Sequence, residues 1–240
     1  MKTLLACPIA FVTAAGAAAA GSVTVAVSEN FLSTAQKLAK DFTDKTGDEV
    51  VISDGSTGAL YAQIVNGAPF DIFLAADAAR PQALEKDGLT AKVAPYAVGR
   101  LVLVSRVPVD AKDAAPAFAG RTVALADPLV APYGLAATRA MERLHLDTAT
   151  FRPVLVANVG QVAAIFSTGN ADLAFVSAAQ VGALNPPYQL TIDTHRTPIL
   201  QEAALLKRAA GNPTAQAFWD MLFSPPARAA IEAAGYALPQ

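Results

Sequence analysis

The sequence predicts an α/β fold, and two patterns predict it. Short apolar runs read as buried strands, and the segments between them carry apolar residues at helical spacing. Strands that alternate with helices are typical of parallel βαβ units. Without its first twenty or so residues the chain keeps about 220, which is enough for one large domain or two smaller lobes.

In the first half, each predicted strand leads into a helical segment. The first strand precedes a helix over about 30–46, where apolar residues recur every three or four positions and Gly47 follows as a C-terminal cap. A second helix follows the loop DGSTG (54–58) and stops at Gly67. The strands expected here are 23–27, 49–53 and 70–75.

The pattern restarts after Tyr96. Helices are expected at about 134–144 and 160–168, and the chain from Asn212 onward is helical, with prolines near the start of a last helix over 224–235. The strands expected in this half are 100–105, 122–126, 153–157 and 173–177.

The N-terminus has the layout of a secretory signal peptide over residues 1–21. Lys2 is followed by an apolar stretch and by small residues, with cleavage expected near Ala20 or Gly21. This predicts export, to the periplasm or, as an alternative, to a secreted destination. Cys7 is the only cysteine, so the mature chain would have no disulfide and no cysteine metal site.

Several classes of function find little support in the sequence. The formal charge is −2 and no basic block occurs, which argues against nucleic-acid binding. The loop GSTG (55–58) lacks the lysine of a nucleotide-binding loop, and no metal-ligand spacing occurs. A nucleophilic serine would need a base, and only His145 and His195 are available, without a G-x-S-x-G motif.

Four strand-to-helix junctions instead carry uncharged hydrogen-bond donors. A helix N-terminus has free N–H groups and a partial positive charge, so it binds anions without a basic side chain. For any one such junction, ordinary helix capping is the better explanation, but the recurrence of these junctions in both halves favours anion capture. The junctions are VSENF (27–31), DGSTG (54–58), APYG (131–134) and NVGQ (158–161).

These junctions lie in stretches that resemble the periplasmic molybdate-binding proteins of ABC importers. The most diagnostic is GSTGALYAQIVNGAPFDIFLAAD (55–77), and the resemblance covers nearly the whole mature chain. It implies the type II periplasmic binding-protein fold, with two α/β lobes and a ligand cleft between them. Lobe 1 would hold 22–98 plus 201–240, and lobe 2 would hold 99–200. The other matching stretches are 29–47, 131–137, 158–161 and 172–177.

The resemblance also implies a set of ligand residues. The first loop would give a polar ligand and a backbone N–H, and the second loop would give a hydroxyl supported by its neighbour. The second lobe would give a tyrosine from PYG and a backbone N–H from NV, as in the branch of the family whose last site loop has no tyrosine. In that order the residues are Asn30, Glu29, Thr57, Ser56, Tyr133 and Val159.

The implied function is that of a solute-binding protein and not an enzyme. It would hold molybdate or tungstate through neutral hydrogen-bond donors, with no cofactor and no protein atom bound to the metal. It would act as a monomer and deliver the anion to an ABC permease with its cytoplasmic ATPase. Two alternatives stay open: another anion (phosphate, sulfate or a small organic acid), or an exported hydrolase using Ser56 or Thr57.

Glu29 departs from the related branch, which has a small hydroxyl residue at this position. Molybdate has only acceptor oxygens, so a carboxylate that pointed at it would repel it. If Glu29 or Asp54 pointed inward, a protonated anion such as monohydrogen phosphate would be favoured. We expect Glu29 to point outward into solvent near a helix N-terminus, where its charge is favourable.

Overall fold

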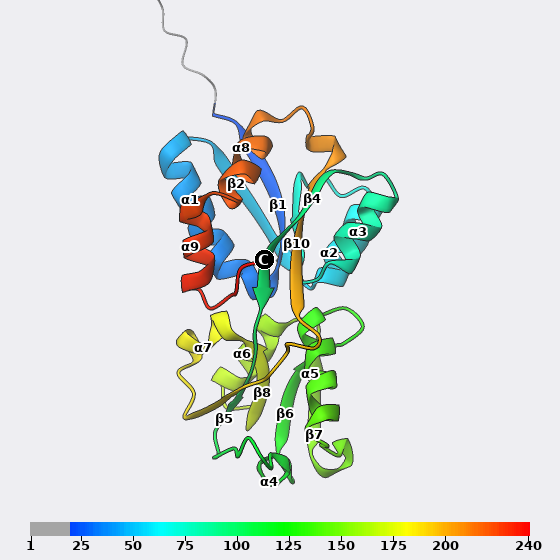
Figure 1. Ribbon diagram of the computed structural model, residues 1–240, viewed down its shortest axis with the longest axis vertical. Helices are drawn as coiled ribbons and strands as arrows, with labels where there is room; N and C mark the ends of the chain where they lie inside the picture. The colour runs from blue at the N-terminus through cyan, green and yellow to red at the C-terminus, as the bar shows by residue number, and fades with distance from the viewer. Residues whose placement is uncertain (1–19) are drawn as a thin grey trace, which may run out of the picture.

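The computed structural model describes residues 20–240, and all but the last two residues of the predicted signal peptide lie outside that range. The chain forms two α/β lobes, each built on one five-stranded sheet and stacked end to end in Figure 1. The predicted α/β class and the two-lobed fold are therefore confirmed.

Lobe 1 is built on a sheet with strand order β2-β1-β3-β10-β4. Its strands are β1 (Ser22–Ser28), β2 (Glu49–Gly55), β3 (Ile72–Leu74), β4 (Thr90–Gly99) and β10 (Ile199–Leu206). Its helices are η1 (Glu29–Phe31), α1 (Leu32–Thr46), α2 (Thr57–Val65), α3 (Ala79–Lys86), η3 (Lys207–Ala209), α8 (Pro213–Leu222) and α9 (Pro225–Ala233).

The helices of lobe 1 cover both faces of its sheet (Figure 1). Successive side chains of a strand point to opposite faces. On β1, Val23, Val25 and Val27 therefore pack into the core beneath α1, α8 and α9, while Ala26 joins a second core beneath α2 and α3. On the face opposite the valines, β1 carries only small residues, among them Thr24, Ala26 and Ser28, which leaves room for the helices that cover that face.

Lobe 2 repeats this plan on a sheet with strand order β7-β6-β8-β5-β9. Its strands are β5 (Leu101–Ser105), β6 (Thr122–Ala126), β7 (Arg152–Val156), β8 (Leu173–Ser177) and β9 (Tyr188–Thr191). Its helices are α4 (Ala115–Phe118), α5 (Pro132–Arg143), η2 (Thr148–Thr150), α6 (Val159–Ser167) and α7 (Ala178–Leu184). The core of this lobe includes Phe118, Phe166 and Phe175.

The prediction of parallel pairing is right for part of each sheet and wrong for the rest. β1, β2 and β3 are parallel to one another, as are β6, β7 and β8. β5, however, pairs antiparallel with β8 and β9, and β10 pairs antiparallel with β3 and β4. The reason is that β5 and β10 each enter their sheet directly from the other lobe. The elements β4, β9, β10, α4 and α7 were not predicted from the sequence.

The chain passes between the lobes twice. The first crossing is at Arg100, between β4 and β5, and the second is the segment 192–198, between β9 and β10. The C-terminal tail returns to the first crossing, where Val98 and Ala237 exchange both backbone hydrogen bonds, of 2.7 and 2.9 Å. The lobe boundaries predicted after residue 98 and before residue 201 fall inside β4 and β10. The division of the chain into two lobes at these residues stays a prediction.

The parallel strands of both lobes point their carboxyl ends at the boundary between the lobes (Figure 1). The helices that follow β1, β2, β6 and β7 therefore begin at this boundary, which is where open α/β sheets bind ligands. Within residues 20–240, the helices are all too short or too polar to cross a membrane.

Candidate functional site

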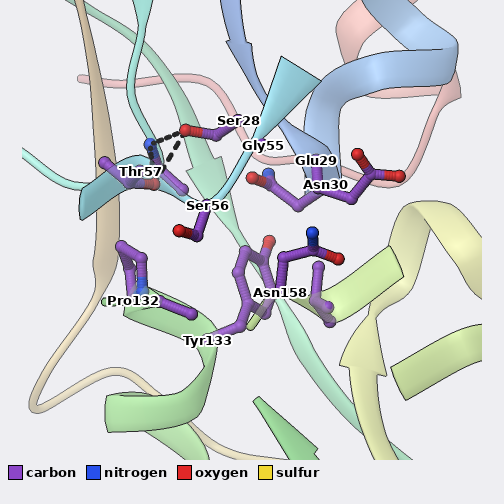
Figure 2. Close-up of a pocket in the computed structure, with 12 residues that line it drawn as sticks. Ser28, Glu29, Asn30, Gly55, Ser56, Thr57, Pro132, Tyr133 and Asn158 are labelled. Carbon is purple, nitrogen blue, oxygen red and sulfur yellow. Dashed lines mark hydrogen bonds between the residues drawn. The ribbon is translucent and has the colours of Figure 1, made fainter. Parts of the chain in front are cut away.

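A small cavity lies between the lobes, where the four predicted junctions meet. All six residues predicted for the site line it, from two segments of lobe 1 and two of lobe 2 (Figure 2). The lining residues are Ser28, Glu29, Asn30, Gly55, Ser56, Thr57, Ala76, Ala131, Pro132, Tyr133, Asn158 and Val159. Within the described part of the chain, this lining includes no lysine, arginine or histidine.

The cavity is surrounded by helix N-termini. α2 begins at Thr57 with Ser56 as its N-cap, and α6 begins at Val159 with Asn158 as its N-cap. The Asn158 side chain accepts a 2.9 Å hydrogen bond from the backbone N–H of Gln161, which fixes the first turn of α6. The first N–H groups of such helices have no partner within the helix and carry a partial positive charge. The site therefore attracts an anion from both lobes.

Ser28 and Thr57 form a pair of buried hydroxyls on the lobe 1 side. Their oxygens are 2.7 Å apart, and the backbone N–H of Ala76 donates to both, at 3.1 Å to Ser28 and 3.3 Å to Thr57 (Figure 2). Each hydroxyl has one hydrogen, and one of the two is used between them. The pair therefore keeps a single O–H donor for a bound ligand.

Ser56 keeps its own hydrogen free. Its Oγ accepts a 3.3 Å hydrogen bond from the N–H of Ala59, as an N-cap does, which leaves the O–H as a donor. Figure 2 shows this hydroxyl directed toward the lobe 2 side of the cavity, near Pro132 and Tyr133.

Tyr133 supplies the corresponding hydroxyl from lobe 2. It is buried at the start of α5, and its oxygen accepts hydrogen bonds from the Ser177 hydroxyl at 3.1 Å and from Gln201 Nε2 at 3.3 Å. Burial raises the pKa of Tyr133 to about 12, so the hydroxyl stays protonated. With two hydrogen bonds accepted, its own hydrogen remains available to a ligand.

The side chain of Asn30 is held by other protein groups. Its Nδ2 donates to Gln201 Oε1 at 3.0 Å and to the Tyr236 hydroxyl at 3.3 Å. The Tyr236 hydroxyl in turn donates to the backbone carbonyl of Asn30 at 2.5 Å. Both amide hydrogens of Asn30 are thus engaged, and the group it still offers to the cavity is its backbone N–H at the start of η1.

Glu29 turns its carboxylate away from Ser56 and Tyr133, as expected (Figure 2). The expectation that it lies in solvent is wrong. Its side chain lies against Gly160 in the first turn of α6 in the other lobe, where a Cβ would overlap Glu29 Cγ and Oε1. Its Oε2 is buried without a hydrogen-bond partner in the described structure. Because a Cβ at position 160 would overlap Glu29, the contact between η1 and α6 requires glycine there.

Burial, followed by the nearby Asp54 carboxyl, raises the pKa of Glu29 to about 7. Two helices of lobe 2, α6 and α7, pack against η1. Neither helix carries an ionisable side chain that could lower the pKa of Glu29 again. On the adjoining α1, Lys37 and Lys40 form ion pairs with aspartates on the exposed face of that helix.

Direct contacts join the lobes beside the cavity. The backbone N–H of Gly58 in α2 donates to the carbonyl of Val130 at 2.9 Å, and Arg80 Nη2 donates to the carbonyl of Leu129 at 3.1 Å. These contacts and the Glu29–Gly160 contact place the lobes together around the site.

Some residues of this site were not predicted. Ser28 lies in the predicted junction VSENF (27–31), so the sequence contained a signal for it. Gln201 and Tyr236 lie far along the chain, on β10 and in the C-terminal tail, and no local pattern connects them to the site. Neither His145 nor His195 is among the described residues that line the cavity.

Comparison with known proteins agrees with this architecture. Residues 23–237 match the family described as bacterial extracellular solute-binding protein. The chain belongs to this family. This solute-binding protein is also 40% identical to the molybdate-binding protein ModA of Azotobacter vinelandii over 92% of each chain. It is 40% identical to ModA of Rhodobacter capsulatus, over 91% of this chain and 89% of that protein.

A solved structure of the Azotobacter vinelandii periplasmic molybdate-binding protein superposes with a TM-score of 0.84. The two chains are 39% identical, and the match covers 91% of the solute-binding protein described here and all of the other chain (100%). The predicted family resemblance is therefore confirmed.

The position of Glu29 makes the stability of the solute-binding protein depend on pH. Its pKa is raised above the usual 4.5 to about 7, so the folded protein binds this proton more tightly than the unfolded chain. The stabilisation from Glu29 is complete below about pH 4.5 and is lost as the pH rises to about 7. Glu29→Gln, which cannot ionise, should therefore gain free energy of unfolding relative to wild type between pH 5 and 8.

Chemical denaturation at several pH values measures this difference. The control is Glu49→Gln, because Glu49 is an exposed glutamate on β2 of the same lobe. A difference between Glu29→Gln and wild type that stays constant from pH 5 to 8 would show that Glu29 does not titrate in this range.

Proposed function

We propose that this protein captures molybdate or tungstate between its lobes and delivers it to an ABC permease with a cytoplasmic ATPase. One observation carries the proposal: uncharged donors from both lobes surround one cavity whose described lining has no cationic side chain. The 40% identity to two molybdate-binding proteins supports molybdate as the anion.

Neutral donors are sufficient for an anion in such a place. Between closed lobes the effective dielectric is low, so each oriented N–H or O–H dipole interacts more strongly than it would in water. Molybdate, tungstate and sulfate have only acceptor oxygens at neutral pH, and they require donors on every side. Because the Glu29 carboxylate points away from the cavity centre, the lining suits an anion that carries no proton of its own (Figure 2).

The geometry suggests a role for each predicted ligand residue. We assign the Ser56 and Tyr133 hydroxyls as direct donors, because each keeps a free hydrogen. We assign the backbone N–H groups of Thr57 and Val159 as donors from the two facing helices. Glu29 and Asn30 would contribute backbone N–H groups, and the Thr57 hydroxyl would act together with Ser28.

Delivery requires that the anion can enter and leave. The lobes are joined at Arg100 and at the segment 192–198, and we propose that these crossings act as the hinge that opens the cavity. An exported monomer would close on its anion in the periplasm and present the closed form to the permease. The site needs no metal cofactor in this scheme, because the protein contacts the oxygens of the anion.

The test is calorimetric titration of the purified mature protein, freed of bound anion, with molybdate, tungstate, sulfate and phosphate. We expect molybdate and tungstate to bind with similar affinity, and sulfate and phosphate to bind much more weakly or not at all. Tight binding of phosphate or sulfate without binding of molybdate would contradict the proposal.

Ser56→Ala should weaken molybdate binding by about 1–3 kcal/mol, because one acceptor oxygen of the buried anion loses its donor. The same change also removes the N-cap of α2, so a loss of stability has to be separated from a loss of affinity. Asn212→Ala is the matched control, since Asn212 caps α8 through the N–H groups of Thr214 and Ala215 and does not line the cavity.

Both variants should unfold more easily than wild type, and only Ser56→Ala should lose affinity for molybdate in calorimetry. Equal affinity in wild type and Ser56→Ala would remove Ser56 from the site.

A further inference from the structure

Gln201 connects donor residues of both lobes, although it does not line the cavity. It is fully buried on β10, at the end of the second crossing, where the pairing of β10 with β4 shifts register. Its Oε1 accepts from Asn30 Nδ2 at 3.0 Å and lies 3.0 Å from the Tyr96 hydroxyl, both in lobe 1. Its Nε2 donates to the hydroxyl oxygen of Tyr133 in lobe 2 at 3.3 Å.

The direction of these hydrogen bonds fixes what Tyr133 can do. The Gln201 amide N–H and the Ser177 hydroxyl both donate to the Tyr133 oxygen, so the phenolic hydrogen points elsewhere. The other end of Gln201 cannot turn toward Tyr133, because its carbonyl oxygen is the acceptor for Asn30. If an acceptor replaced the Gln201 N–H, it would compete with the anion for the hydrogen of Tyr133.

We propose that Gln201 is a positioning residue for anion binding, which orients the Tyr133 hydroxyl as a donor to the anion when the lobes close. This inference rests on the proposed function and extends it to a residue outside the cavity. It links formation of the binding site to closure, because the partners of Gln201 belong to different lobes.

Gly99 provides independent geometric support. It lies at the end of β4, where the chain leaves lobe 1, and a Cβ there would overlap the Tyr133 hydroxyl oxygen and lie 2.7 Å from Gln201 Nε2. The Gln201–Tyr133 hydrogen bond can form only because this position of the crossing strand has no side chain. A side chain at position 99 would force the two groups apart.

The test is a double-mutant cycle with Gln201→Met and Tyr133→Phe, in which molybdate affinity is measured by calorimetry. Each single variant should bind molybdate roughly tenfold or more weakly than wild type, since a buried acceptor loses an oriented donor. In the Tyr133→Phe background, the added loss from Gln201→Met should fall below about threefold, because the residue through which Gln201 acts has already been altered.

A purely structural role would give a different result. Gln201→Met also leaves Asn30 Nδ2 without its acceptor, so the ligand-free protein should unfold more easily. That loss alone, with unchanged molybdate affinity, would overturn the proposal. An equal loss of affinity in both backgrounds would overturn it too. If wild type itself fails to bind molybdate, the proposed function is what fails.

Gly99→Ala keeps the proposal testable if Gln201→Met does not fold. Its control is Gly182→Ala in α7, where an added Cβ meets nothing within 4 Å. Gly99→Ala should weaken molybdate binding roughly tenfold or more, and Gly182→Ala should leave it unchanged. Wild-type affinity in Gly99→Ala would show that contact between Tyr133 and Gln201 is not needed for binding.

Discussion

The proposed capture of an anion depends on one physical constraint: because the described lining of the cavity has no basic side chain, helix N-termini have to be directed at the anion from opposite sides. Parallel strands meet this constraint, because each strand that leads into a helix places the N-terminus of that helix at its own carboxyl end. In lobe 1 this arrangement brings η1 and α2 to the cavity, and in lobe 2 it brings α5 and α6. The rest of each sheet holds these helix starts in position.

Closure of the lobes involves opposing effects. The Gly58–Val130 hydrogen bond and the Gln201–Tyr133 hydrogen bond favour the closed arrangement. The Glu29 carboxyl opposes it, because it is covered by the first turn of α6 while Asp54 lies nearby. Under the proposed function, moderately favourable closure would help the protein release its anion to a permease, and the lack of a cationic side chain in the described cavity lining would act in the same direction.

Much of this fold and site could be predicted from the sequence, because the information is local. The helical spacing in 30–46 and the apolar strands reflect burial that each segment shows by itself. The sequences of the junctions DGSTG and APYG contain the hydroxyl donors Ser56, Thr57 and Tyr133. All six predicted residues line one cavity. That they bind the anion remains a prediction.

What the sequence did not show depends on contacts between distant segments. The antiparallel direction of β5 and β10 follows from crossings between lobes, which no periodicity records. Gln201 is one residue in an apolar strand, and it acquires its position only when β10, Asn30 and Tyr133 come together. The environment of Glu29 likewise depends on Gly160 of the other lobe. A crystal structure of the protein with molybdate, with diffraction recorded at the molybdenum absorption edge, is the direct test of the proposed binding site. We expect one anomalous peak in the cavity, with the oxygens of the anion hydrogen-bonded to Ser56, Tyr133 and the first N–H groups of α2 and α6. A peak elsewhere, or a protein side chain bonded directly to molybdenum, would contradict it.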